Sequence, residues 1–569
     1  MIFILGIDDI KSGVFHKIAM IDMYLDIAFT NGSVITVNEN DDICEAVGVK
    51  NGRIAYVGDN EGITDMIGEK TKVIDLKGCT LMPGINDSHY HPILNGMIRP
   101  EPAAAIINTS IATAKNFDEL FGIIRKAASL KKPGEWISCM GHEAGLLEEQ
   151  RHPTLEELDK VYSDGPLQLI TANGHNGIYN SKALEYIGIY EPEDASKYPD
   201  GEVCVDAGRL TGEIRGHTHF ALWSKVGYTE EQQKKAALIS QEKCFKHGIT
   251  SVGDMGECGS ASYHLMQKLC RSGEFKIRTY MAIHSIFGKP FSMEENDHWL
   301  NLGLITGLGD EHFRIGPCKF MIDGGSGEPT CYTREPYSHD PSKPYEKAWN
   351  REETWDYIKK IDEHECQCTA HAMGDGAIEY MIEGYERAYN SCDDKEAFKS
   401  RRHRIEHCMI VDQDLINRMA VMNICPSVNA GLQIRNGKNL AKFYGSQREQ
   451  YIGALRSMLD AGIVCSLHSD APSGPCGFNM IAGAVTRYDK NSNYQCSRAQ
   501  AVSLLEAIRC CTINAAYQSY EEDIKGSIET GKLADLIVTN CNILDIDPME
   551  LSDVVVEMTM IDGEIVWVR

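Results

Sequence analysis

The sequence has no long hydrophobic run. No apolar stretch approaches the roughly 20 residues that a helix needs to span a bilayer. The opening MIFILGIDDIKSG starts with apolar residues, but it lacks the basic segment and the longer apolar stretch of a signal peptide. We therefore expect no membrane-spanning segment.

Basic residues are scarce. The chain of 569 residues has 56 Lys and Arg against 82 Asp and Glu, which gives a net charge of -26. Such a surface repels phosphate backbones and anionic lipid, so we expect no nucleic acid and no membrane surface as partner. A small-molecule substrate held in a pocket is compatible with this charge.

The 20 cysteines include no CxxC pair. Several lie within apolar, strand-like runs, such as Cys425 in VMNICPSV and Cys465 in GIVCSL. Scattered cysteines of this kind are typical of buried free thiols in a reducing compartment. This pattern predicts a cytoplasmic protein without a disulfide framework.

Both ends of the chain have β-strand patterns. DIAFTNGSVITVN and AVGVKNGRIAYVGD alternate apolar and polar positions around an Asn-Gly pair, and MTMIDGEIVWVR does so around Asp562-Gly563. Such pairs are the strongest short signal for a hairpin. We expect residues 24–82 and 521–569 to form one composite β-sandwich, with residues 1–22 outside it.

The middle of the chain, residues 83–520, alternates strand-like and helix-like segments. Helical patterns include EETWDYIKKIDEH and DQDLINRMAVM. This α/β alternation predicts a (β/α)8 TIM-type barrel, in which the chemistry lies at the C-terminal ends of the strands. The eight predicted strands are TLMPGINDSH, ITSVGDM, KIRTYMAI, RIGPCKFMID, CQCTAHA, HRIEH, MNICPS and IVCSLHSD.

An insertion of about residues 93–248 separates the first two of these strands. It is far longer than one crossover requires, and it has its own signals in FDELFGIIRKAASL, EWISCMG, TLEELDKV and PLQLITANG. We expect it to form a lobe that covers the mouth of the barrel.

The motif NDSHYHP places two histidines at positions i and i+2, which share one face of a strand. Two such imidazoles can share a metal ion, or their spacing can be a coincidence. Other ionisable residues lie at later strand ends, and each has an ordinary explanation as a polar strand end, a snorkelling lysine or a helix N-cap. Their joint position at one end of a barrel predicts a metal centre made of His89, His91, Lys319, His371, His407 and Asp470.

Four imidazoles and one carboxylate suit Zn²⁺, as one or two ions per chain, while other divalent metals remain open. Lys319 differs from these ligands because a protonated ammonium cannot bind a cation. Burial drives a lysine toward its neutral form, and a neutral amine can add CO2 to give a carbamate that bridges two metals.

These motifs resemble the amidohydrolase superfamily, and within it the YtcJ-like metal-dependent hydrolases of amidohydrolase family 3. The resemblance covers about residues 24–569 and rests on LMPGINDSHYHP, CKFMIDGGSG, HAMGDGAIE, RHRIEHC and LRSMLDAGIVCSLHSDAP. It implies a barrel with a composite sandwich, a metal site and hydrolysis of a C–N bond. By position, the implied ligands are His89, His91, carboxylated Lys319, His371, His407 and Asp470.

Three further histidines need an interpretation. GHNGIYNSKAL resembles a family stretch within the insertion, so His175 is a candidate donor that reaches the site, or else a structural residue that fixes the loop beside Gly174. His142 in GHEAG is a weaker candidate. We expect His468 to alternate away from Asp470 and pack outside the barrel.

Two stretches depart from the family pattern. LTGEIRGH has Glu213 earlier than the usual glutamate and Gly216 near its expected place, and GGSGEPTCY also differs. Both fall where substrate contacts are expected, so the resemblance transfers the metal site but not the substrate.

These observations together predict a metal-dependent hydrolase of a non-peptide, amide-type C–N bond in a small molecule. Asp470 would move the proton and His175 would donate a hydrogen bond. The alternatives are a deaminase or cyclic-amide hydrolase on the same scaffold, and a metal-free scaffold protein. The sequence leaves the oligomeric state open, with a homodimer as one alternative.

Overall fold

The computed structural model describes residues 24–569 except 111, 199–201, 257–259, 284–293, 328, 342–350 and 491. The expectation for residues 1–22 therefore lies outside the described residues. Within them, no helix combines the length and the apolar character that crossing a membrane requires.

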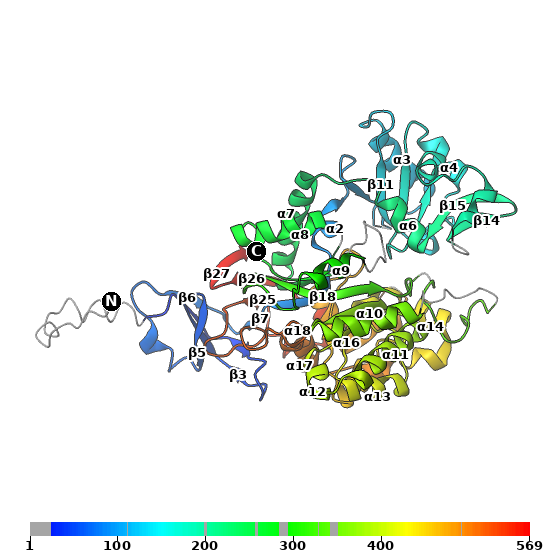
Figure 1. The fold of residues 1–569 in the computed structure, drawn as a ribbon. Helices are drawn as coiled ribbons and strands as arrows, with labels where there is room; N and C mark the ends of the chain where they lie inside the picture. The colour runs from blue at the N-terminus through cyan, green and yellow to red at the C-terminus, as the bar shows by residue number, and fades with distance from the viewer. Residues whose placement is uncertain are drawn as a thin grey trace, which may run out of the picture.

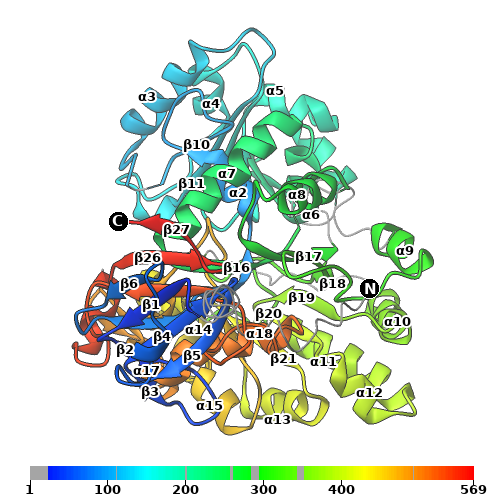
Figure 2. The same ribbon diagram turned by 90° about the vertical axis from the view of Figure 1, so that its left-hand side faces the viewer.

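The middle of the chain forms an eight-stranded parallel barrel (Figures 1 and 2). All eight predicted strands are present, so the predicted fold class is confirmed. The barrel strands are β8 (Ile85–Tyr90), β16 (Ile249–Asp254), β17 (Arg278–Ile283), β18 (Phe313–Met321), β19 (Cys368–Ala372), β20 (Arg404–His407), β21 (Cys425–Val428) and β22 (Ser466–Leu467). They pair in chain order, from β8 to β22.

Hydrogen bonds bring the first and last barrel strands together. The backbone N–H of Asp470 donates to the carbonyl of His89 at 3.0 Å, and that of His91 donates to Ala471 at 3.2 Å. The hydroxyl of Ser88 also donates to the carbonyl of Leu467 at 3.0 Å. The barrel is thus nearly closed, and its closure places the two halves of the predicted site side by side.

The predicted first strand is divided at Gly84. β7 (Thr80–Pro83) belongs to a sheet at the chain ends, and β8 belongs to the barrel. A Cβ at position 84 would lie 2.2 Å from the hydroxyl oxygen of Thr250, so only glycine fits at this crossing point. The chain therefore passes from one sheet to the other without a loop.

Helices cover the outside of the barrel, and α13 (Gln413–Met422) illustrates why they form. Asp412 caps its N-terminus by accepting from Leu415 N at 2.9 Å, and Asn423 ends it in the left-handed region at φ 55°. The helix buries one face, formed by Leu415, Ile416, Met419 and Met422.

The other helices along the barrel are α7 (Glu230–Lys246), α8 (Ser260–Ser272), α9 (Glu294–Asn301), α10 (Arg351–Glu363), α11 (Asp375–Ser391), α12 (Lys395–Ser400), α14 (Gly431–Glu449), α15 (Leu455–Asp460), α16 (Phe478–Thr486), α17 (Leu504–Cys510) and α18 (Ile513–Gln518). A short hairpin, β23 (Tyr488–Asp489) and β24 (Tyr494–Gln495), follows α16.

The two chain ends form two sheets around a common core. Their strands are β1 (Ile27–Thr30), β2 (Ser33–Ile35), β3 (Ile43–Cys44), β4 (Ala46–Lys50), β5 (Arg53–Gly58), β6 (Lys72–Asp75), β25 (Leu536–Thr539), β26 (Val556–Ile561) and β27 (Glu564–Val568). One sheet has the order β5-β4-β1-β6, and the other, β27-β26-β25-β7-β2-β3, joins both ends. The residue numbers chosen for the domain boundaries remain predictions.

Two of the three predicted hairpins form. Asn51 and Gly52 turn β4 into β5, and Asp562 and Gly563 turn β26 into β27, all with positive φ as a primed turn requires. The hairpin predicted at Asn31-Gly32 is wrong, because β1 and β2 belong to different sheets. The physical reason is burial, since the crossing puts apolar side chains of both strands into the core between the sheets.

The insertion forms a lobe with its own sheet and core, above the barrel in Figure 2. Its sheet has the order β14-β15-β13-β12-β11-β10-β9, and the predicted helices and strands of this segment are present. The strands are β9 (Ile98–Arg99), β10 (Ile106–Asn108), β11 (Ile137–His142), β12 (Leu167–Thr171), β13 (Asn176–Tyr179), β14 (Val203–Asp206) and β15 (Arg209–Arg215). The helices are α2 (Pro92–Met97), α3 (Phe117–Ala128), α4 (Leu155–Val161), α5 (Ser181–Leu184) and α6 (Gly216–Trp223).

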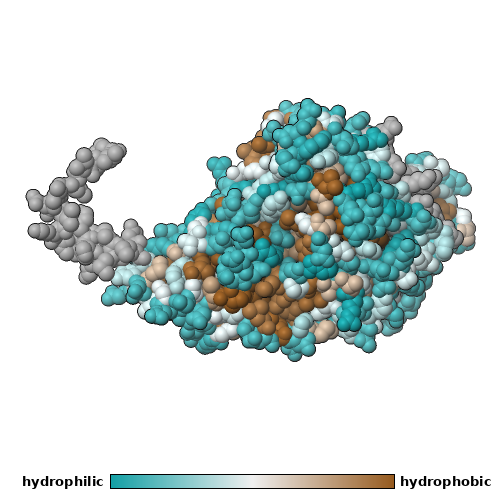
Figure 3. Space-filling view, turned by 90° about the horizontal axis from the view of Figure 1, so that it is seen from below, coloured by the Kyte–Doolittle hydropathy of each residue, from teal (hydrophilic) through white to brown (hydrophobic). Residues whose placement is uncertain are grey.

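The surface carries both hydrophilic and hydrophobic side chains. The face turned down in Figure 1 carries a group of hydrophobic side chains within a largely hydrophilic surround (Figure 3). The hydrophilic surround agrees with the strongly acidic composition.

A buried ion pair joins the barrel to the terminal sheets. Arg278 at the start of β17 donates to both carboxylate oxygens of Asp535, at 2.6 and 2.9 Å, and the side chains are 1% and 5% exposed. Burial alone would raise the pKa of Asp535, but the charge and hydrogen bonds of Arg278, with smaller contributions from the Asp562 N–H and the Lys525 charge, together hold that pKa below its ordinary value. The pair connects the N-terminal end of barrel strand β17 to the segment that leads into β25.

We expect Arg278→Met to destabilise the protein by about 3–5 kcal/mol, because it leaves the Asp535 carboxylate buried without its partner. The measurement is the midpoint of denaturant unfolding. Lys276→Ala is the control, since it breaks an exposed pair with Glu564. A loss no larger than the control's would contradict the role of Arg278 as an anchor.

Candidate functional site

The two histidines of NDSHYHP converge with Asp470. His89 lies at the end of β8, His91 follows it, and their ring centroids are 5.2 Å apart. Nε2 of His89 lies 3.4 Å from Oδ1 of Asp470, and Nε2 of His91 lies 3.3 Å from the same atom. Their ligand atoms lie within 4.8 Å of one another, a spacing at which three side chains could hold one metal ion.

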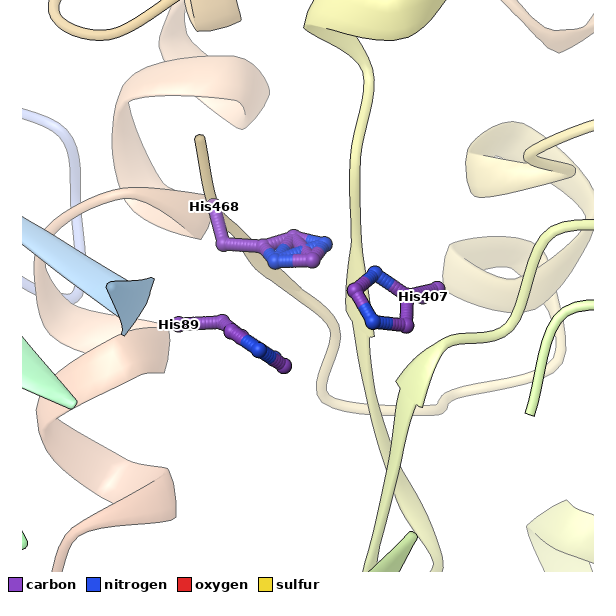
Figure 4. A group of neighbouring side chains, drawn as sticks. All are labelled: His89, His407 and His468. Carbon is purple, nitrogen blue, oxygen red and sulfur yellow. The ribbon is translucent and has the colours of Figure 1, made fainter. Parts of the chain in front are cut away.

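A second group consists of His89, His407 and His468, whose ligand atoms also lie within 4.8 Å of one another. Figure 4 shows the three rings pointing toward one another from three different segments. The ring centroids of His407 and His468 are 4.8 Å apart, and all three residues are buried. The two groups share His89.

Several nitrogens of this group lack a partner. Among the described residues, neither ring nitrogen of His468 has a hydrogen bond, and neither does Nδ1 of His407. A buried polar atom without a partner is costly, so such atoms usually face a ligand or an ion. The donor set therefore fits a divalent metal such as Zn²⁺.

The prediction that His468 packs outside the barrel is wrong. Its side chain is fully buried inside, 4.9 Å from the ring of His89. The physical reason is that β22 ends at Leu467 and Asp470 has a left-handed φ, so the alternation of a strand does not extend over His468 and Asp470. Burial lowers the pKa of His468 to about 3, which keeps the ring neutral.

Lys319 points into the same space from β18. Its side chain is buried, and Nζ lies 3.2 Å from Nε2 of His89. Burial lowers the pKa of Lys319 to about 8, although Glu406 and Asp470 oppose that shift. A substantial fraction of Lys319 is therefore neutral near pH 8.

His371 lies beside the cluster but outside both groups. Its ring centroid is 4.5 Å from that of His407, and its Nε2 lies 3.1 Å from the carbonyl of Gly324. The structure thus brings His371 next to the predicted ligands, with one ring nitrogen engaged by the backbone.

Two of the predicted ligands have unusual backbone conformations. His407 has φ 70° and Asp470 has φ 57°, in the left-handed region that non-glycine residues rarely adopt. Both stand where a barrel strand gives way to a loop. Such strain is typical of functional sites, where surrounding contacts hold a side chain in place.

The insertion lobe does reach the site through His175. This residue lies between β12 and β13, its ring centroid is 4.6 Å from that of His371, and it lines a cavity together with Asp470. Burial lowers the pKa of His175 to about 4, so the ring is neutral at pH 7.

Three other lobe residues noted in the sequence, His142, Glu213 and Gly216, are not among those that line the cavity of Asp470 and His175. Nε2 of His142 lies 2.9 Å from Nδ1 of His152. Glu213 accepts from Arg215 at 2.8 Å and from Asn176, and Gly216 begins α6. They form polar contacts within the lobe.

Sequence reasoning missed Glu406. Its carboxylate accepts a hydrogen bond from Nδ1 of His89 at 2.9 Å and another from the hydroxyl of Thr369 at 2.6 Å. This bond fixes the proton of His89 on Nδ1 and leaves Nε2 unprotonated, with its lone pair directed toward the space that Lys319 and Asp470 share. A charged residue in a strand as buried as β20 was the available signal.

Asp87 was also missed. It accepts from the backbone N–H of Ser469 at 3.0 Å and from its hydroxyl at 2.6 Å, and burial raises its pKa to about 7. These bonds hold the residue that precedes Asp470. The signal was a carboxylate two positions before His89, on the same face of the strand.

Two cavities lie at the mouth of the barrel. An inner cavity of about 60 Å³ is lined by Asp470, His175 and Asn173, among others. An outer cavity of about 760 Å³ lies between the lobe and α14. The two cavities share Glu143, Ala172, Arg435 and Asn436 in their linings, so they adjoin each other.

Comparison with known proteins agrees with this geometry. The chain is 28% identical over 560 residues to the N-substituted formamide deformylase of Arthrobacter pascens, an alignment that covers 96% of this chain and 98% of that protein. It is 27% identical to the protein YtcJ of Bacillus subtilis (strain 168), with 88% and 91% covered.

A solved metal-dependent hydrolase from Pyrococcus horikoshii OT3 has the same fold, with a TM-score of 0.70 and 22% identity over 92% of this chain and 98% of that one. The model of the amidohydrolase family, Amidohydro_3, matches residues 72–567. The chain therefore belongs to the amidohydrolase family, as its motifs predicted.

Proposed function

We propose that this chain is a zinc-dependent hydrolase that cleaves a non-peptide, amide-type C–N bond of a small molecule. The observation that carries the proposal is the convergence of His89, His91 and Asp470 beside the unpartnered nitrogens of His468. The name of the formamide deformylase supports an amide-type substrate, since the alignment spans almost the whole chain.

His89, His91 and Asp470 would hold one ion, and His407 and His468 would offer ligands beside it. A bound divalent ion would polarise the substrate carbonyl and lower the pKa of a water molecule toward neutrality. Glu406 keeps His89 in the tautomer that can serve as a ligand.

The protein's own groups would move the proton. The Asp470 carboxylate lines the inner cavity and is 17% exposed, so it can accept a proton from the attacking water and return it to the leaving nitrogen. His175 is neutral at pH 7 because burial lowers its pKa to about 4, and its N–H can donate to the substrate carbonyl oxygen.

The first test is a screen of N-acyl amino acids, formamides and cyclic amides with the zinc-loaded enzyme. We expect Asp470→Asn to lower kcat on any hit by about 10²–10⁴-fold, because both proton transfers pass through this carboxylate. Zinc content is measured in parallel to separate lost catalysis from lost metal. Retained activity would show that another base acts, and ammonia as the product would favour a deaminase.

A second prediction concerns Glu406. We expect Glu406→Gln to weaken zinc binding by about 10–100-fold, because His89 loses its charged acceptor. Competition titration with a chelator measures the affinity. Asp362→Asn is the matched control, since Asp362 is a buried carboxylate bonded to His403 at the opposite end of β20. Equal losses in both variants would contradict the assignment.

A third prediction concerns the carboxylation of Lys319. We propose that the neutral amine adds CO2, and we expect bicarbonate to raise the zinc content of the wild type above one ion per chain. Lys319→Arg should not respond, because its guanidinium stays protonated. Native mass spectrometry should detect the added CO2 in the wild type alone. A zinc content independent of bicarbonate would exclude the carbamate.

A further inference from the structure

The inner and outer cavities meet at an ion pair between the lobe and the barrel. Glu143 follows β11 in the lobe, and Arg435 belongs to α14 on the barrel. Their side chains are in direct contact, and both residues line both cavities, together with Ala172 and Asn436. The pair therefore stands in the wall between the two spaces.

Arg435 is also tied to the loop of Asp470. It donates to the carbonyl of Ser473, and the N–H of Ser473 donates to the carbonyl of Asp470 at 2.7 Å. The Glu143 and Arg435 side chains are 17% and 29% exposed. Since the pair is partly exposed, and since such pairs contribute little to stability, this contact can open without unfolding the lobe.

The cavity volumes limit what can bind on each side. At about 15 Å³ for each water-sized group, the inner cavity of about 60 Å³ holds roughly four such groups. The outer cavity of about 760 Å³ is within the range for a drug-sized ligand. With its carbonyl beside Asp470, a substrate therefore has much less room for its inner half than for its outer half.

We propose, on the basis of the function proposed above, that the Glu143–Arg435 pair is a size-selective divider. The substrate class is an N-substituted amide with a formyl- or acetyl-sized acyl group in the inner cavity and a larger amine half beyond the pair. Water adds its oxygen to the carbonyl carbon, the C–N bond breaks, and the nitrogen receives the proton from Asp470. The products are a small carboxylate inside and an amine outside.

The sizes of the two cavities determine which half of the substrate lies on the inner side. The carbonyl carbon and oxygen take up about half of the inner cavity, which leaves room for about two more atoms on the acyl side. The leaving amine departs through the outer cavity once the ion pair opens. A primary amide with a large acyl group would need the reverse arrangement, so it should be a poor substrate.

The test compares formyl, acetyl and isobutyryl amides of benzylamine, together with phenylacetamide as the reversed compound. We expect kcat/KM to fall at least 100-fold from the formyl to the isobutyryl amide. In Glu143→Ala the wall is removed, and we expect this ratio to shrink at least tenfold. The charge-reversed double variant, Glu143→Arg with Arg435→Glu, rebuilds the pair and should recover most of the ratio.

Arg418→Gln is the matched control, because Arg418 forms a similar partly exposed pair with Glu386 between α13 and α11, outside the barrel. Its ratio should equal that of the wild type. An unchanged ratio in Glu143→Ala, no recovery in the double variant, or a preference for phenylacetamide would each overturn the proposal.

Binding of formate, acetate and isobutyrate to the zinc-loaded protein, measured by calorimetry, tests the cavity without turnover. Tenfold weaker binding of isobutyrate, with no amide hydrolysed, would support the small inner cavity and reject the proposed function. Amide hydrolysis with equal binding of all three acids would support the function and reject the divider.

Discussion

The site depends on the hydrogen bonds that close the barrel between β8 and the segment after β22. The N–H of Asp470 donates to the carbonyl of His89, and Asp87 holds Ser469 from the other side. Because residues from the two ends of the barrel sequence meet there, neither motif can form the site alone. The cost is strain, since Asp470 must adopt a positive φ to turn its carboxylate inward.

Burial then sets the protonation of the site. His407 and His468 are enclosed, and burial holds the pKa of each well below the ordinary value, so both rings are neutral, as a metal ligand must be. The same burial shifts Lys319 toward its neutral amine. Buried ring nitrogens without a hydrogen-bond partner, such as those of His468, are costly, and a bound cation would compensate that cost.

Much of this arrangement could be predicted from the sequence, because it depends on the regular alternation of side chains along strands and on the alternation of strands with helices. The eight strands and the inward histidines follow from alternation and from the equivalence of strand ends in a barrel. The hairpin predicted at Asn31-Gly32 was wrong, because burying the apolar side chains of β1 and β2 between two sheets outweighed the local preference for a turn. Glu406 could not be predicted, because a hydrogen bond between two different strands leaves no local pattern. The prediction for His468 was wrong because it assumed strand alternation beyond Leu467, where β22 ends.

The candidate metal ligands and the lobe residues that line the cavities belong to different parts of the chain. Every candidate ligand belongs to the barrel, whereas His175 and Glu143 approach from a segment with its own sheet and core. A lobe that folds around its own core can change its loops without disturbing the strands that carry His89 or Asp470. The family motifs therefore locate the candidate metal ligands on barrel strands, whereas the contacts between lobe and barrel around the cavities leave no local motif in the sequence.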